Sequence, residues 1–235
     1  MKAAAIQMNS SDQVDSNLFK AESLLTQAKD AGADVCFLPE NFAFMGHPNE
    51  LLNSVINEAK SLTSERGFLE ELSKEEILDI CKKIGNSGLK YFLLKVDPKK
   101  KMSFNPKETI DLSGHTGPFI QYTFVRIKSL LNKSEDLNSE FSIEDLKLNS
   151  KELEVLKWIS NFSDVLAQSA KELSPYLLAN YLYSLVKSYN SFYQDHPIIT
   201  EKENALRNFR IQMSKLVAEI IEKGMKILGI EMPER

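Results

Sequence analysis

The chain has 235 residues, of which 43% are hydrophobic and 26% are charged, proportions that are ordinary for a globular protein with a buried core. No apolar run approaches the roughly 18 residues that span a bilayer, and the first residues turn polar too soon for a signal peptide, so we expect neither. The two cysteines, Cys36 and Cys81, are too few for a disulfide framework, and a cytoplasmic protein is expected.

Charge is distributed unevenly along the chain. Residues 1–50 carry seven acidic residues against three lysines, whereas residues 51–235 carry equal numbers of acidic and basic residues. Within this neutral part, the stretch 82–107 has eight lysines and one acidic residue, and the stretch 119–133 has three basic residues and no acidic one. Such runs often form only a solvated face, but two of them are also compatible with binding to a polyanionic partner.

The first fifty residues have the pattern of a β-α-β unit. Ala3–Met8 and Val35–Leu38 are short apolar segments typical of strands, and Pro39 ends the second one. Between them, apolar residues recur at helical spacing until Gly32. A helix between two apolar strands predicts a parallel, right-handed crossover. Because a parallel sheet needs more than two strands and no later segment clearly supplies another, the pattern indicates a fragment.

Strand signals almost vanish after this unit, so the predicted fold class is mainly α, with a C-terminal helical bundle preceded by the short β-α-β fragment. Ser73–Glu76 is a capping box, and Gly85–Gly88 is expected to end the helix behind it. Pro175 suits a first helical position, and Gly229 is expected to stop the last helix. Further helices are predicted over residues 119–133, 151–173, 175–193 and 205–228.

The N-terminal part resembles the start of the nitrilase, or carbon–nitrogen hydrolase, superfamily. The resemblance covers residues 1–46 and rests on three segments: Ala5-Ile6-Gln7-Met8, Gly32-Ala33-Asp34 and Leu38-Pro39-Glu40-Asn41-Phe42. It implies that Glu40, directly after a buried strand, corresponds to the general base of a Glu-Lys-Cys triad. In that family the triad hydrolyses amides and nitriles through a thioester.

No nucleophile completes such a triad in this sequence. Cys36 lies inside the strand before Glu40, and Cys81 lies on the apolar stripe of a capped helix, so both cysteines are predicted to fill the core. The Cys-Tyr-Asp-Leu-Arg context of the family's nucleophile is missing from the sequence. We therefore expect no amidase activity, and a remnant hydrolase with Glu40 as an orphan base stands only as an alternative.

A helix predicted after Gly117 carries candidate RNA-binding residues. Phe119, Tyr122 and Arg126 are spaced to share one face, with Gln121 near its edge. Aromatic rings, an amide and a guanidinium along one helix suit the unstacked bases and phosphates of single-stranded RNA. On composition alone, packing of the two aromatic residues in the core is the commoner role. The pattern by itself leaves both interpretations open.

Residues from about 50 to 235 resemble the C-terminal part of the arginyl-tRNA synthetase (arginine–tRNA ligase) family. One motif, Asn204-Ala205-Leu206-Arg207, approximates the Asp-Ala-Leu-Arg string that names the family's helical anticodon-binding (DALR) domain. The other matching segments are Lys90–Val96, Gly117–Tyr122 and Gly224–Arg235. Agreement at several separated motifs, over about four-fifths of the chain, makes this resemblance specific.

The resemblance implies that the chain binds arginine tRNA through the anticodon arm. Phe119 stands where many family members have tyrosine, which keeps the stacking surface and loses a hydroxyl. The residues that the resemblance assigns to the anticodon loop are Phe119, Gln121, Tyr122 and Arg126, with Tyr193 as a further base contact. The residues that it assigns to the tRNA backbone are Lys99, Lys100 and Lys101.

The family's His-Ile-Gly-His and Lys-Met-Ser-Lys-Ser signatures, which bind ATP and activate arginine, are missing from this sequence. We therefore expect no aminoacylation by this chain alone and no cofactor in it, although full-length family members use ATP and Mg. His47, His115 and His196 lack metal-ligand spacing, so no metal site is expected. A helical scaffold without an RNA role remains as a further alternative.

Three parts are predicted along the chain. They are a nitrilase-like β-α-β fragment (1–48), a helical connector that follows the synthetase catalytic core in the family (49–112) and a helical anticodon-binding domain (113–235). The two resemblances meet near residues 46–50. A monomer is expected, with arginine tRNA as its partner, and neither DNA nor a membrane is expected as a partner.

Overall fold

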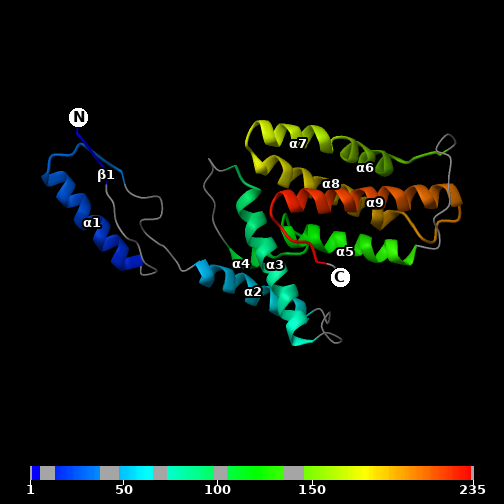
Figure 1. Cartoon of the computed structure of the whole chain (residues 1–235), viewed down its shortest axis with the longest axis horizontal. Helices are drawn as coiled ribbons and strands as arrows, with labels where there is room; N and C mark the ends of the chain where they lie inside the picture. Colours follow the sequence, from blue (N-terminus) through cyan, green and yellow to red (C-terminus); the bar gives the residue numbers. More distant parts are fainter. Residues whose placement is uncertain are drawn as a thin grey trace. The chain divides into compact units, whose positions relative to one another are not determined.

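The computed structural model divides the chain into two compact units, residues 1–54 and 55–235 (Figure 1). The structure describes residues 2–5, 14–37, 48–65, 73–97, 105–134 and 146–233. Most of these residues are helical, so the prediction of a mainly α fold is confirmed. Within these ranges, none of the helices is both long and apolar enough to cross a membrane.

The N-terminal unit is the parallel β-α-β crossover that its pattern predicts. Its elements are β1 (Ala3–Ala5), α1 (Val14–Asp30) and β2 (Val35–Phe37), and the strands pair in parallel. Gly32 follows α1 with a φ of +78°, a left-handed conformation that glycine adopts without strain. Asp34 then joins the two strands, because its amide donates to the Lys2 carbonyl (2.8 Å) and its carboxylate accepts from the Lys2 amide (2.7 Å).

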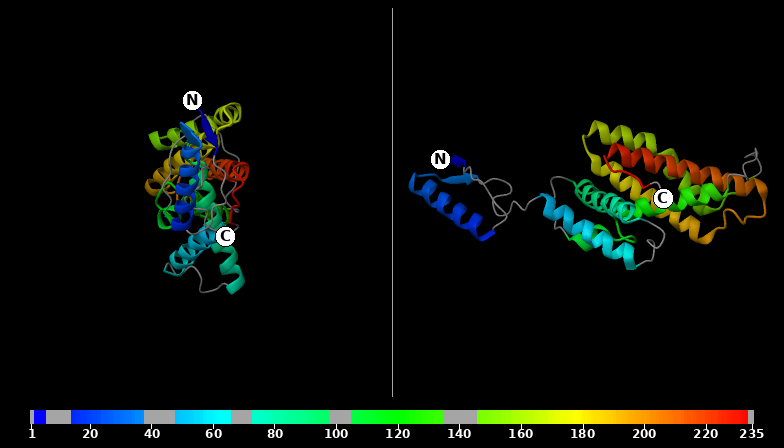
Figure 2. Two further views of the ribbon diagram at one scale, coloured as in Figure 1. Left: turned by 90° about the vertical axis from the view of Figure 1, so that its left-hand side faces the viewer. Right: turned by 60° about the horizontal axis from the view of Figure 1, so that its bottom comes forward.

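The C-terminal unit is helical in its described residues, and α2 crosses the boundary between the two units. The helices are α2 (Pro48–Glu65), α3 (Lys74–Leu94), α4 (Pro106–Thr109), α5 (Gly117–Lys133), α6 (Ser150–Ser160), α7 (Phe162–Lys171), α8 (Pro175–Asp195) and α9 (Asn204–Ile227). Helices α5, α8 and α9 pack on one another, and α6 and α7 pack on α8 (Figure 2).

Three helix ends form as the sequence predicts. Ser73 accepts a hydrogen bond from the Glu76 amide while the Glu76 carboxylate accepts one from the Ser73 amide, which completes the capping box of α3. Pro175 begins α8, where its missing N–H costs no helical hydrogen bond. Gly229 follows α9 with a φ of +68°, the left-handed conformation that commonly ends helices.

The prediction that Gly85–Gly88 ends a helix is wrong, because these residues lie inside α3. Both glycines lie where the helix touches a neighbouring segment. A Cβ atom on Gly85 would lie 2.8 Å from Ile56 of α2, and one on Gly88 would lie 2.9 Å from the Thr109 carbonyl oxygen. The glycines therefore permit close packing of α3, in spite of their low helix propensity.

The single helix predicted over residues 151–173 is two helices, α6 and α7, which meet at Asn161. The Asn161 amide donates to the Lys157 carbonyl at the end of α6, and its carbonyl accepts from the Val165 amide at the start of α7. The apolar pattern continues through the break because both helices pack against α8.

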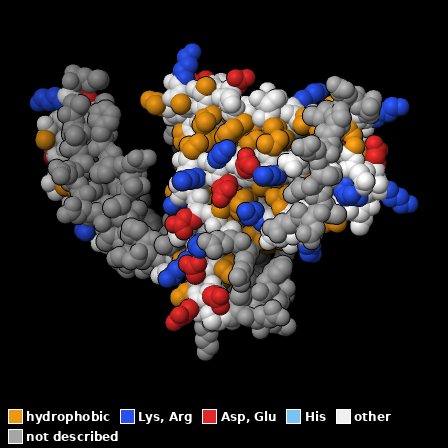
Figure 3. All heavy atoms as spheres, turned by 45° about the vertical axis from the view of Figure 1, so that its right-hand side comes forward, with side chains coloured by type: hydrophobic (Ala, Val, Ile, Leu, Met, Phe, Trp, Pro, Cys, Tyr) orange, Lys and Arg blue, Asp and Glu red, His pale blue; other side chains and the backbone are white. Residues whose placement is uncertain are grey.

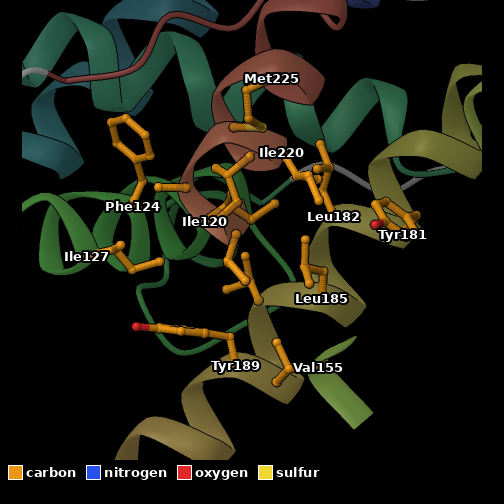
Figure 4. Close-up of a cluster of buried hydrophobic side chains, with 14 of the residues drawn as sticks. Ile120, Phe124, Ile127, Val155, Tyr181, Leu182, Leu185, Tyr189, Ile220 and Met225 are labelled. Atoms are coloured by element: carbon orange, nitrogen blue, oxygen red, sulfur yellow. The ribbon is translucent and has the colours of Figure 1, made fainter. Parts of the chain in front are cut away.

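The core of the C-terminal unit is formed mainly by α5, α8 and α9 (Figure 4). Its fully buried side chains include Ile120, Ile127, Leu182, Leu185, Tyr189, Val217, Ile221 and Met225. Gly224 lets α9 approach α8, since a Cβ atom there would lie 2.7 Å from Leu182. Removing this apolar surface from water, at about 25 cal/mol per Å², is the main contribution that stabilises the bundle.

A buried cation ties α9 to α6 and to the segment before α9. Arg210, 4% exposed, donates to the carboxylates of Glu152 and Glu201 at 2.7 Å each, and to the Pro197 carbonyl oxygen. Glu152 is fully buried and also accepts from the Asn149 amide in the capping box of α6. Because a buried charge without its partner is costly, these bonds fix the position of α6 on α9.

We expect the N-terminal unit to be the less stable of the two. A two-stranded sheet with one helix buries little apolar surface, and Phe19 of α1 is 74% exposed. Hydrogen exchange followed by mass spectrometry should therefore be faster in residues 14–37 than in α8 and α9. Equally slow exchange in both units would contradict this expectation.

Candidate nucleic-acid interface

Helix α5 exposes one stripe of side chains and buries much of its remaining surface. Thr116 caps its first turn, since the Thr116 hydroxyl accepts a hydrogen bond from the Phe119 amide (3.2 Å). Phe119, Tyr122 and Arg126 are all partly exposed, as expected for residues that share this stripe. Phe119 also packs against the core, so the core-packing interpretation holds in part for this residue.

Arg126 lies between two aromatic rings. Its guanidinium carbon is 4.7 Å from the ring centroid of Tyr122 and 5.3 Å from that of Tyr193 in α8. Cation–π attraction of this kind contributes about 0.5–1 kcal/mol at exposed positions. The structure thus brings together three residues that the sequence proposes for one site, from two helices.

Asn190 of α8 orients the same guanidinium. Its side-chain oxygen accepts a hydrogen bond from Arg126 Nη1 (3.2 Å), and its Nδ2 donates to the Thr123 hydroxyl (2.9 Å). In the part of the chain that the structure describes, no carboxylate forms an ion pair with Arg126. The sequence did not indicate Asn190, because its role arises only when α8 packs on α5.

We call Tyr122, Arg126, Asn190 and Tyr193 the Arg126 site. A guanidinium is planar and permanently charged, so it can donate hydrogen bonds to phosphate or base oxygens. The tyrosine rings beside it add stacking surface, which is worth about 1–3 kcal/mol per base in single-stranded nucleic-acid sites. The site therefore has the chemistry that an unstacked nucleotide requires.

A second aromatic group, of which the sequence indicated only Phe119, lies at the start of α5. His115 stacks on Tyr183 of α8 with ring centroids 3.9 Å apart, and Phe119 lies against the same tyrosine at 5.8 Å. His115 Nε2 is 3.0 Å from the hydroxyl oxygen of Tyr91 in α3. Burial and then the charge of Lys95 lower the pKa of His115 to about 4, so the imidazole is neutral at pH 7.

Gln121 does not belong to the exposed stripe. The residue is 2% exposed, and its Nε2 donates to the Glu231 carbonyl oxygen at 2.7 Å. Its position next to Tyr122 suggested a role at the edge of the face, but successive helical residues point about 100° apart. Gln121 instead anchors the C-terminal segment to α5.

Four of the remaining predicted site residues lie outside the described ranges, namely Glu40, Lys99, Lys100 and Lys101. Cys81 is fully buried in α3, as predicted, and the side chain of Cys36 is not among those described. Over the described ranges, no group of three His, Cys, Asp or Glu side chains is arranged to hold a metal ion.

Basic residues do not form one continuous positive surface on the face drawn in Figure 3, where basic, acidic and hydrophobic side chains are interspersed. Some of the lysines are neutralised locally: Lys83 pairs with Asp79 (2.9 Å), and Lys151 pairs with Asp195. With a net charge of −4, the chain must rely on local contacts rather than on its overall charge to bind a polyanion.

Comparison with protein families matches two parts of the chain to different families. Residues 120–235 match the DALR anticodon binding domain, and residues 2–80 match the carbon–nitrogen hydrolase family. The chain is 42% identical over 191 residues to an arginine–tRNA ligase of Porphyromonas gingivalis, a match that covers 80% of this chain and 32% of that protein. It is 46% identical over 188 residues to the Flavobacterium psychrophilum ligase, covering 80% of this chain and 31% of that one.

Solved structures show the same fold. The chain is similar to Thermus thermophilus arginyl-tRNA synthetase, with a TM-score of 0.72 and 21% identity over 99% of this chain and 40% of that chain. It is also similar to the Plasmodium falciparum synthetase, with a TM-score of 0.66 and 19% identity over 99% of this chain and 41% of that one. The chain spans about a third of the length of the curated relatives that it matches.

The lowered pKa of His115 predicts a pH-dependent stability. The unfolded chain takes up a proton as the pH falls through the ordinary histidine value of 6.5, whereas the folded chain resists protonation until about pH 4. The contribution of His115 to the free energy of unfolding is therefore complete above pH 6.5 and is lost as the pH falls towards 4. In urea unfolding at pH 7 and pH 5, the free energy of unfolding should change less with pH for His115→Gln than for the unmodified chain. An equal change in both proteins would contradict a lowered pKa of His115.

Proposed function

We propose that this chain, whose residues 120–235 match the DALR anticodon binding domain, binds the anticodon arm of arginine tRNA. Two separate observations support the proposal. The chain is homologous to arginine–tRNA ligases over 80% of its length, and its α5–α8 face carries the chemistry that an unstacked nucleotide requires.

The observation that carries the proposal is the Arg126 guanidinium between the rings of Tyr122 and Tyr193. Asn190 holds the guanidinium in place, and no described carboxylate neutralises it. The loop bases of a tRNA are splayed out and need a stacking partner and a hydrogen-bond donor, and this group supplies both.

We propose binding of tRNA without aminoacylation. The relatives are named as ligases, but the chain spans about a third of their length, and the signatures through which family members bind ATP and activate arginine do not occur in this sequence. We therefore assign no catalytic step to this chain.

The N-terminal match to carbon–nitrogen hydrolases does not lead us to propose an amidase. Such chemistry needs an accessible cysteine nucleophile beside its base. Cys81, just beyond the matched residues, is fully buried in α3, and Glu40 lies outside the described residues. Trapping of a thioester at either cysteine with an amide substrate would reopen this alternative.

Replacement of Arg126 by alanine should weaken the binding of arginine tRNA about tenfold, because it removes a charged donor and the cation between two rings. Arg126→Lys should restore only part of the affinity, since an ammonium neither stacks nor presents a planar set of donors. Filter binding or fluorescence titration of the full chain at one fixed salt concentration measures both effects.

Lys171→Ala is the matched control, because it removes one positive charge from an exposed position on α7, away from the Arg126 site. The control should leave the affinity within about twofold, since an exposed single charge contributes little. Equal affinities for Arg126→Ala and the unmodified chain would refute the proposed site, provided that both proteins have the same melting temperature.

A further inference from the structure

We infer that His115, Phe119 and Tyr183, here called the His115 platform, bind a second nucleobase of the same RNA. This inference rests on the proposed function and extends it from one base to two. The three side chains come from the loop before α5, from α5 itself and from α8, so the platform exists only in the folded unit.

The three rings already form a stacked arrangement. His115 and Tyr183 lie 3.9 Å apart with an angle of 26° between their planes, and Phe119 meets Tyr183 at 5.8 Å and 53°. All three are partly exposed, whereas other aromatic residues of α8, such as Tyr189 and Phe192, are fully buried. Aromatic surface that is ordered and yet reaches solvent is suited to stacking on a base.

The hydrogen bonds around His115 fix which of its nitrogens carries the proton. The Tyr91 hydroxyl donates its only hydrogen to the Ala179 carbonyl oxygen (2.8 Å), so its contact with His115 Nε2 requires Nε2–H as the donor. The other ring nitrogen, Nδ1, then holds a lone pair that can accept a hydrogen bond from the amino group of a base. The neutral imidazole is therefore a base-stacking group rather than a phosphate-binding cation.

The His115 platform and the Arg126 site lie along one seam between α5 and α8. At one end of the seam Phe119 meets Tyr183, and at the other Arg126 meets Tyr193. Between these pairs Asn190 donates to the hydroxyl of Thr123 (2.9 Å). Phe119 and Arg126 are seven residues apart, or about 10 Å along the helix, which is too far for one base to stack at both ends.

Positive charge is available close to the His115 platform. Lys95 Nζ donates to the His115 carbonyl oxygen at 2.8 Å and lies above the ring of Phe92. Lys187 is exposed on α8, one turn from Tyr183 and one turn from Asn190. A strand that crosses from one end of the seam to the other would pass its phosphates by Lys187.

The test uses the full chain and an anticodon stem-loop RNA of arginine tRNA, with a fluorescent aminopurine base placed in turn at each loop position. Stacking on an aromatic ring quenches this fluorophore. We expect quenching at two loop positions, of which one is lost in Tyr183→Leu and the other in Arg126→Ala. Tyr183→Phe keeps the ring and should retain the quenching, and Tyr176→Leu, in the first turn of α8, should leave both positions unchanged.

Affinities from the same titrations decide whether the two ends act separately. Tyr183→Leu should weaken binding about tenfold, as expected for the loss of one stacked base. Its effect should multiply with that of Arg126→Ala, because the two ends bind different bases. If Tyr183→Leu does not fold, His115→Gln offers a milder change that removes the stacked imidazole and keeps a donor for Tyr91.

The outcomes separate this inference from the proposed function. A loss of affinity with Arg126→Ala but none with the folded Tyr183→Leu or His115→Gln would overturn the His115 platform and leave the proposed function standing. Unchanged affinity in all of the variants would overturn both. Quenching at a single loop position that every variant abolishes would also overturn the platform, since it would indicate one base bound at one composite site.

Discussion

The burial of α5 on several sides is the constraint on which the rest of the C-terminal unit depends. Helices α3, α8 and α9 all pack on it. At its first residue, Gly117, a Cβ atom would lie 2.7 Å from the Ser87 carbonyl oxygen, so no side chain fits between α5 and α3. Phe119, Tyr122 and Arg126 stay partly exposed, and residues near the end of the helix, such as Lys128, are exposed. The packing that stabilises the bundle therefore also leaves exposed the α5 residues that we propose contact RNA.

Local sequence signals predicted the helices and their ends well, because caps and apolar periodicity act within a few residues. The capping box at Ser73 and the helix stop at Gly229 are examples. The prediction that Gly85 and Gly88 end a helix was wrong, since the role of both glycines is to permit close packing of α3 on neighbouring segments. That role depends on segments distant in the sequence, which a local pattern does not contain.

The candidate site was predictable only along α5. Tyr122 and Arg126 share a helix, so their spacing alone places them together. Asn190 and Tyr183 join them through the packing of α8, and no spacing rule connects residues more than fifty positions apart. Gln121 shows the opposite error, because sequence adjacency to Tyr122 suggested exposure, while its side chain is buried against the carbonyl oxygen of Glu231.

The most direct test of anticodon reading is a titration of the full chain with arginine tRNA and with a transcript in which only the central anticodon base is changed. Phosphate contacts are identical in the two RNAs, so any difference in affinity comes from reading of the base. We expect tighter binding to the unchanged tRNA, by about tenfold, since the altered transcript loses one well-formed base contact. Equal and strongly salt-sensitive binding of both RNAs would show only general electrostatic attraction and would contradict this expectation.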